Sequence, residues 1–266
     1  KWHPKSVLQS EGMPSGAAVF LGQQLALGRK IGFKVFVDEG KDGEVENMEN
    51  VVVKIFPEMM EKKVAVTELV RELENFFDDH ERDGWRLIVG HQFFLCVDGE
   101  HDQCCGTYGT ILYPQLIDCV QKNNLSIKVF CCSHLGGHKY APTGIVFPGG
   151  DMYGRIDSSA HNALLECVAT GKIFAPCYRG TAGLSIEEQV ARYAVAAQGI
   201  VEASQDIRID TMDDKGSTKS MVVTLCSDKK MILTLQNKIF IGPQSCKKSD
   251  RGEQRERWLV DAVEIV

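Results

Sequence analysis

Two short loops in this sequence carry residue types that bind metals. The first, CVDGEHDQCCG, begins at Cys96 and contains the adjacent Cys104 and Cys105. The second, HLGGH, has His134 and His138 on either side of two glycines. Thiolate and imidazole ligands favour zinc or an iron–sulfur cluster over magnesium or calcium. The two loops therefore predict a metal centre held by Cys96, by Cys104 or Cys105, and by both histidines.

The spacing of these residues bears on the kind of metal. Structural zinc sites typically use cysteines about two to four residues apart, whereas Cys96 and Cys105 are separated much more widely. Ligand pairs on two separate loops suit a larger object such as a two-iron cluster. Two cysteines and two histidines are also the ligands of Rieske-type [2Fe–2S] centres. Spacing alone leaves zinc and a two-iron cluster both open.

The elements around the loops must bring them to one place. Apolar runs over residues 86–97 and 126–132 predict strands. Residues 107–121 between them have helical periodicity, with Pro114 expected in the first turn of that helix. Each loop follows one of the two strands, and ligands usually collect at the carboxyl ends of parallel strands. We therefore expect both loops at the same end of a parallel strand pair.

The elements that follow indicate the fold class. Residues 143–147 and 152–156 predict a hairpin around a Pro-Gly-Gly-Asp turn. Residues 158–169 predict a helix with Ser158 as its cap, ended by Gly171. The order strand, helix, strand, hairpin and helix predicts a thioredoxin-like α/β domain over residues 85–184.

The flanking parts differ from this central domain. Residues 1–84 predict an N-terminal α/β segment, with strands at 17–21, 34–37 and 51–56 and a helix at 66–77. Residues 185–266 predict a small β-rich extension. It opens with a helix whose Ser185 and Glu188 match a capping box. Its predicted strands lie at residues 221–226, 231–235 and 238–241, followed by a closing segment at 258–266.

A family resemblance rests on four segments in this order: FFLCVDGEHDQCCGTYG, CCSHLGGHKYAPTGIVFP, MYGRI and YRGTAGL. Together they resemble the sucrase/ferredoxin-like family, which includes thioredoxin-like ferredoxins of fungi, some of them mitochondrial. The resemblance covers residues 85–184, and the upstream segment VKIFPEMM at residues 53–60 shows a weaker similarity. No carboxylate pair stands in a glycosidase context, so the sucrase part of the family name has no support in this sequence.

The resemblance implies a [2Fe–2S] cluster in the thioredoxin-like domain. Its ligands would be Cys96, Cys105, His134 and His138. Cys105 is favoured because the family motif places glycine directly after the second cysteine, as Gly106 does here; the neighbouring Cys104 competes. The implied function is one-electron transfer, with a protein redox partner or within a multi-subunit redox complex. The resemblance favours a mitochondrial location on the matrix side, with the cytosol or a plastid as alternatives.

The remaining cysteines are interpreted by their context. Cys131 and Cys132 lie in a predicted strand, where buried small hydrophobic residues are expected. Cys119, Cys167 and Cys226 are expected in the core for the same reason. Cys177 and Cys246 are expected in loops, where they could react, although nothing in the sequence activates them. An alternative function is a thioredoxin-fold thiol oxidoreductase using a vicinal cysteine pair, although no C-x-x-C motif opens a helix. A third is a structural subunit with a zinc or vacant site.

Composition excludes several classes of function. The 266 residues are 44% hydrophobic and carry a net charge of −6, which gives no sign of a nucleic-acid-binding surface. Most of the ten cysteines lie between residues 96 and 132 rather than spreading through the chain as in a disulfide-rich secreted protein, so we expect a reducing compartment. No transmembrane segment is predicted, because charged or amide side chains interrupt the most apolar stretch, residues 16–36.

Overall fold

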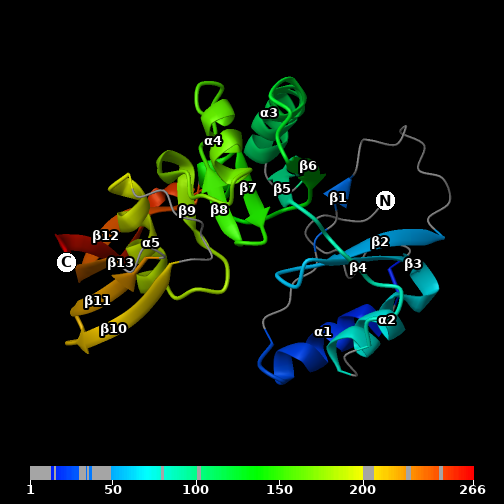
Figure 1. Cartoon of the computed structure of the whole chain (residues 1–266), viewed down its shortest axis with the longest axis horizontal. Helices are drawn as coiled ribbons and strands as arrows, with labels where there is room; N and C mark the ends of the chain where they lie inside the picture. The colour runs from blue at the N-terminus through cyan, green and yellow to red at the C-terminus, as the bar shows by residue number, and fades with distance from the viewer. Residues whose placement is uncertain are drawn as a thin grey trace.

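The computed structural model describes residues 13–14, 16–29, 34, 36–37, 49–78, 81–100, 103–199, 207–225, 229–245 and 248–266. These residues form a six-stranded, a four-stranded and a three-stranded β-sheet. Figure 1 shows the six-stranded sheet in the middle, with the N-terminal sheet on one side and the C-terminal sheet on the other. The central sheet carries both predicted ligand loops.

The core of the central sheet is a strand–helix–strand unit followed by a hairpin. β5 (His91–Cys96) and β6 (Ile127–Cys132) are parallel neighbours, and α3 (Gln103–Lys122) connects them. β7 (Thr143–Phe147) pairs antiparallel with the other edge of β5, and β8 (Asp151–Gly154) pairs antiparallel with β7. Both loops therefore leave the same end of the sheet, as the sequence predicts.

Further elements complete this sheet. β1 (Phe36–Val37) pairs antiparallel with β6 at one edge, and β9 (Tyr178–Thr181) pairs with β8 at the other. α4 (His161–Val168) and the short 3₁₀ helix Ala175–Cys177 connect β8 to β9. The central strands lie in the order β6-β5-β7-β8, and in the sequence α3 follows β5 and α4 follows β8. This arrangement defines a thioredoxin-like α/β fold. The predicted fold class is confirmed.

The two faces of the central sheet have different partners. Phe93 and Leu95 belong to the main core with the buried residues of α3 and α4, which lie on one side of the sheet (Figure 1). Phe94 and Phe130 belong to a second apolar cluster that also contacts Phe56 of the N-terminal part. The alternation follows from the two-residue period of a strand.

The N-terminal sheet consists of β2 (Asn50–Ile55), β3 (Met60–Ala65) and β4 (Arg86–Leu87) in antiparallel order. α1 (Gly16–Ala26), the 3₁₀ helix Val66–Glu68 and α2 (Leu69–Phe77) accompany it. The strand predicted at residues 17–21 is wrong, because these residues form part of α1. Ala17, Phe20 and Gln24 of α1 are buried at helical spacing, so the apolar run is one stripe of a helix.

The C-terminal sheet is a β-rich extension, as predicted. Its strands are β10 (Arg208–Asp214), β11 (Thr218–Thr224), β12 (Lys230–Ser245) and β13 (Lys248–Ile265), paired antiparallel in sequence order. α5 (Ile186–Ala197) packs against it and contributes Ala191, Ala194 and Val195 to their shared core. The capping box of α5 is confirmed: Ser185 Oγ accepts from Glu188 N–H, and the Glu188 carboxylate accepts from Ser185 N–H.

Three local expectations in the central domain are wrong. The strand predicted over residues 86–97 is broken, because Gly90 has a φ of +77° between β4 and β5. Pro114 lies inside α3 rather than in its first turn. The N-cap of α4 is Ala160 rather than Ser158, and in the turn before it the Asp157 Oδ1 accepts from the backbone N–H groups of Ser159 and Ala160.

The predicted division into residues 1–84, 85–184 and 185–266 stays a prediction. Two short strands cross the first boundary: β1 lies before it and joins the central sheet, while β4 lies after it and joins the N-terminal sheet. The first two parts are therefore joined through strand pairing as well as through the chain.

Candidate metal centre

Cys96 is the last residue of β5, and its side chain is fully buried. The Cys105 thiol donates a hydrogen bond to Cys96, and this bond is the largest cause of a lowered pKa for the Cys96 thiol, which is about 6. The backbone N–H groups of Asp98 and Leu135 also donate to Cys96, while burial opposes the shift. Three donors from different parts of the chain thus stabilise a thiolate at this position.

Cys105 reaches Cys96 because α3 starts unusually close to the end of β5. A Cβ on Gly106 would lie 2.9 Å from the Gly99 backbone nitrogen, and one on Gly109 would lie less than 3.0 Å from the Cys96 carbonyl oxygen. Real Cβ atoms essentially never approach backbone atoms so closely. Glycine at these helix positions therefore permits the approach that places Cys105 beside Cys96.

The structure separates the two adjacent cysteines of α3. Cys105 is 1% exposed and contacts Cys96, whereas Cys104 is only half-buried. Consecutive helix residues point about 100° apart, so only one of them can face the end of β5. This geometry supports Cys105 over Cys104, and the ligand assignment itself stays a prediction.

The histidine loop, residues 133–140, follows β6 and lies against the cysteine pair. His134 is half-buried with its Nδ1 atom enclosed, and the next residue, Leu135, donates its N–H to Cys96. His138 begins the 3₁₀ helix His138–Tyr140, and its side chain lies outside the described part of the structure. Gly136 and Gly137 between the histidines have φ values of +85° and +69°, so the turn depends on glycine.

The donors at this site are of the types that hold a [2Fe–2S] cluster. Among the side chains that the structure describes, no group of three or more His, Cys, Asp or Glu residues converges closely enough to hold one metal ion. Two thiols in mutual contact, with backbone N–H groups directed at one of them and a histidine loop alongside, supply sulfur and nitrogen donors from separate segments. A larger cofactor that bridges the segments fits this arrangement.

The neighbouring cysteines are strand and core residues, as expected. Cys131 belongs to the core beneath α3 and α4, and Cys132 to the cluster on the opposite face of the sheet. Burial raises the pKa of Cys132 well above its ordinary value. Cys119 is buried too, while Cys167 of α4 is half-buried. Because consecutive strand side chains point to opposite faces, Cys131 and Cys132 cannot form a disulfide in this conformation.

The expectation that Cys177 lies in a loop is wrong. Cys177 ends a 3₁₀ helix, is 5% exposed, and has its thiol pKa raised by burial. A thiol that is both buried and protonated is a poor nucleophile. Cys226 and Cys246 lie outside the described residues.

Asp98 and Tyr140, next to the thiol pair, were not identified as important from the sequence. Asp98 is 6% exposed and lies beside Cys96, and Tyr140 has three cationic side chains over its ring. These cations belong to Lys139, Arg155 and Arg179, at 5.2, 5.2 and 4.8 Å from the ring centroid. The motif segments contain all three, but their convergence on one ring depends on tertiary structure.

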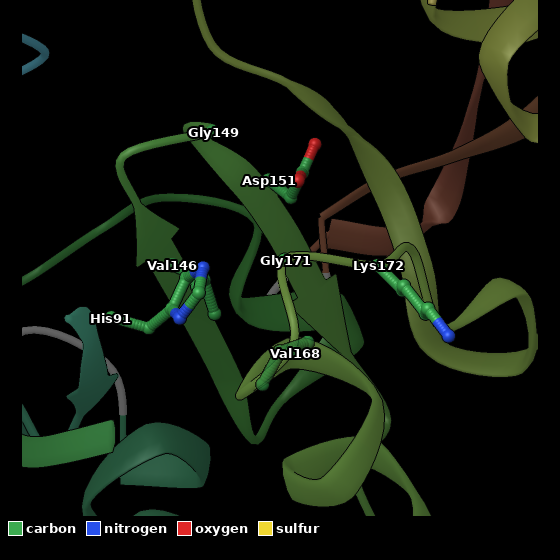
Figure 2. A pocket seen from close by; sticks show the side chains of 7 residues that line it. All are labelled: His91, Val146, Gly149, Asp151, Val168, Gly171 and Lys172. Carbon is green, nitrogen blue, oxygen red and sulfur yellow. The ribbon is translucent and has the colours of Figure 1, made fainter. Parts of the chain in front are cut away.

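Two cavities lie close to the central sheet without being the predicted centre. Figure 2 shows a cavity of about 10 Å³ lined by His91, Asp151 and Lys172, which has room for about one water molecule. His91 begins β5, so this cavity lies at the opposite end of the strand from Cys96. A cavity of about 870 Å³ lies over the face of the central sheet opposite α3 and α4. Cys132 and Leu135 are among its described lining residues, but Cys96, Cys105 and His134 are not.

The fold and these loops define a thioredoxin-like α/β protein with a thiol pair next to a histidine loop. The model of the sucrase/ferredoxin-like family matches residues 8–180. The match spans more than half of the chain, and the protein belongs to this family.

Among solved structures, the chain is similar to a thioredoxin-like [2Fe–2S] ferredoxin from Aquifex aeolicus, at 15% sequence identity and a TM-score of 0.32. That likeness covers 36% of this chain and 98% of the ferredoxin. No curated protein sequence matches the chain. Within the described residues, none of the helices combines the length and the apolar character needed to cross a membrane.

Proposed function

We propose that this protein is a one-electron carrier that holds a [2Fe–2S] cluster through Cys96, Cys105, His134 and His138. The observation that carries the proposal is the contact between the Cys96 and Cys105 thiols, with the Leu135 N–H of the histidine loop donating to Cys96. The two predicted ligand loops are far apart in sequence, and the hydrogen bond from Leu135 N–H joins the histidine loop to the Cys96 sulfur. Membership of the sucrase/ferredoxin-like family supports the same proposal.

Each of these residues has a defined role in the proposal. Cys96 and Cys105 bind as thiolates, and the N–H groups of Asp98 and Leu135 offset the negative charge on Cys96. His134 and His138 bind through neutral imidazole nitrogens. When bound, a [2Fe–2S] cluster accepts and releases a single electron. The role of the protein is to fix the ligands, limit water access and set the reduction potential.

The mixed ligand set predicts a raised reduction potential. Two neutral imidazoles in place of two thiolates make reduction less opposed by charge, so we expect a value near the Rieske range of about −150 to +300 mV. Imidazole N–H groups that face solvent can also lose protons, which makes the potential depend on pH. A potential that falls as pH rises above neutrality is the expected behaviour.

The proposal is tested by purifying the full chain without oxygen and measuring iron, acid-labile sulfide and visible absorption. About two irons and two sulfides per chain are expected. Cys105→Ser should lose most of the iron, whereas Cys104→Ser is the matched control and should retain it. A colourless wild-type chain without iron would refute the proposal, and iron loss in Cys104→Ser alone would move the ligand to Cys104.

The histidine ligands have a separate test. His134→Cys or His138→Cys adds a thiolate, so each variant should keep a cluster but show a lower potential. Lys139→Gln is a control next to His138 that leaves the ligand set intact. A potential unchanged by both cysteine substitutions would exclude histidine ligation.

A thiol oxidoreductase is the second candidate, and one observation favours it. Cys96 has a lowered pKa and contacts Cys105, which is how a reactive dithiol is built. Against it, both cysteine residues are buried, at 0% and 1% exposure, so a protein disulfide could not reach them without opening the loops. A metal-free protein that carries a reversible Cys96–Cys105 disulfide, found by mass spectrometry of non-reduced peptides, would favour this candidate.

The partner and location complete the proposal. An electron carrier needs a donor and an acceptor, so we infer a protein redox partner or a place in a multi-subunit redox complex. We infer a mitochondrial location from the family resemblance. Subcellular fractionation of the native protein tests the location, and crosslinking of the same fractions identifies the partner.

A further inference from the structure

Arg179 is the extra residue of a β-bulge at the edge of the central sheet. Tyr153 of β8 pairs with Tyr178, and Met152 pairs with Gly180, which leaves Arg179 without a partner residue in the ladder. A bulge locally changes the direction in which a strand residue points. Here the Arg179 side chain lies against the histidine loop, which comes from a different part of the sheet.

Two glycines make room for the arginine. A Cβ on Gly137 would lie 2.7 Å from the guanidinium carbon of Arg179, and a Cβ on Gly154 would lie 2.5 Å from its Cδ atom. Gly137 stands between His134 and His138, and Gly154 ends β8. The stem therefore rests on the strand and the guanidinium on the turn that joins the two histidines.

The ring of Tyr140 also contacts the Arg179 guanidinium. The Arg179 guanidinium lies 4.8 Å from the ring centroid, within the range of a cation–π interaction. Tyr140 donates its N–H to the Gly137 carbonyl at 2.8 Å and accepts from the Arg155 N–H at 2.7 Å. Arg179 thus contacts both ends of a turn that hydrogen bonds already close.

Arg179 is also electrostatically linked to the thiol pair. Burial lowers the pKa of the guanidinium, while interactions with Tyr140 and Cys105 oppose that shift. Arginine keeps its charge in proteins. The positive charge of Arg179 therefore lies close enough to Cys105 to interact with it.

We propose that Arg179 is the positioning residue of the metal centre, clamping the histidine loop in its ligating shape through Gly137 and Tyr140 and placing a fixed positive charge beside the cluster. The second part rests on the proposed function, because only a bound cluster can sense the charge. The clamp itself is a contact within the chain and does not require a bound cluster.

The clamp is tested on the full chain freed of metal, by hydrogen–deuterium exchange of residues 133–140 with mass spectrometry. Arg179→Gln should speed exchange in this loop about five- to thirty-fold, the effect of losing the cation–π contact together with the packing of the guanidinium on the Gly137 turn. Arg155→Gln is the matched control, because Arg155 lies over the same ring but the glycine turn does not need to accommodate its side chain. It should change exchange much less.

Two neighbouring glycines give a second test that keeps Arg179 in place. Gly137→Ala forces the guanidinium away, whereas at Gly136 an added Cβ meets nothing within 4 Å although its φ is also positive. Gly136→Ala therefore measures the effect of backbone strain alone on loop exchange. Gly137→Ala should speed loop exchange more than Gly136→Ala does. Adding Gly137→Ala to Arg179→Gln should speed exchange further only by the backbone strain that Gly136→Ala measures, because both changes remove the same Arg179 contact.

The charge is tested on the iron-loaded protein. Arg179→Gln should lower the reduction potential and the iron content, and Arg179→Lys should restore the potential while leaving loop exchange fast. Wild-type exchange in Arg179→Gln, or equal effects of Gly136→Ala and Gly137→Ala, would overturn the clamp whether or not iron is bound. If wild type binds no iron but the exchange pattern holds, the proposed function fails and the clamp stands. An unchanged potential in Arg179→Gln would overturn the electrostatic part.

Discussion

Gly109→Ala tests the close approach of α3 to β5 on which the cysteine pair depends. Residue 109 lies about one helical turn after Cys105. Its new methyl group would lie less than 3.0 Å from the Cys96 carbonyl oxygen. An unstrained separation is about 3.5 Å, so the helix and the strand end must separate by more than about 0.5 Å. Backbone atoms cannot rotate away from such a contact.

The size of the effect follows from two opposing terms. Overpacking of this kind costs about 1–3 kcal/mol, while replacing glycine by alanine inside a helix contributes about 0.5–1 kcal/mol of stability. A net loss of about 0.5–2 kcal/mol in the free energy of unfolding is expected. The melting temperature should fall by about 2–4 °C per kcal/mol. Separation of Cys105 from Cys96 should also reduce the iron content.

The assay is thermal unfolding by circular dichroism, with iron measured on the same samples. Gly22→Ala in α1 is the matched control, because an added Cβ there meets nothing within 4 Å. This control should raise stability by about 0.5–1 kcal/mol and leave iron unchanged. If Gly109→Ala proved as stable as Gly22→Ala and held full iron, α3 would not approach β5 as described.

Three further predictions address other parts of the chain. Cys132→Ala should retain full iron, since Cys132 packs in the cluster with Phe94 and Phe130 rather than serving as a ligand; loss of iron in this variant would require a new ligand assignment. Ser185→Ala should cost about 1 kcal/mol in denaturant unfolding, because it removes the capping box of α5; an unchanged midpoint would mean that α5 does not need this cap. Burial lowers the pKa of His91, against a hydrogen bond to Ala169, so the unfolded chain binds this proton more tightly. Stability should therefore fall as pH drops below about 6.5, and His91→Asn should lose that part of the pH dependence; equal pH profiles for wild type and variant would contradict this.

Much of the central domain could be predicted from sequence because its signals are local. The continuous apolar runs of β5 and β6 and the hairpin turn between β7 and β8 act over a few residues, as does the capping box of α5 in the C-terminal extension. The loops were placed correctly relative to these strands for the same reason. The run at residues 17–21 was misread because a short apolar stretch fits a strand as well as one stripe of a helix.

The contacts of the metal centre could be predicted only in part. Residue types and the family motif indicated the four ligands, but the Cys96–Cys105 contact depends on the packing of α3 against β5 through Gly106 and Gly109. Arg179 lies far along the chain from the histidine loop, and only the bulge in β9 brings them together. Such tertiary contacts leave no periodic signal in the sequence.

The central claim is that two cysteines and two histidines hold a [2Fe–2S] cluster. Pulsed electron paramagnetic resonance of the reduced full chain, with and without ¹⁵N-labelled histidine, tests it most directly. The account predicts a signal from the reduced cluster with hyperfine couplings from two histidine nitrogens, both changed by the label. A signal without histidine nitrogen coupling, or no iron-dependent signal, would contradict it.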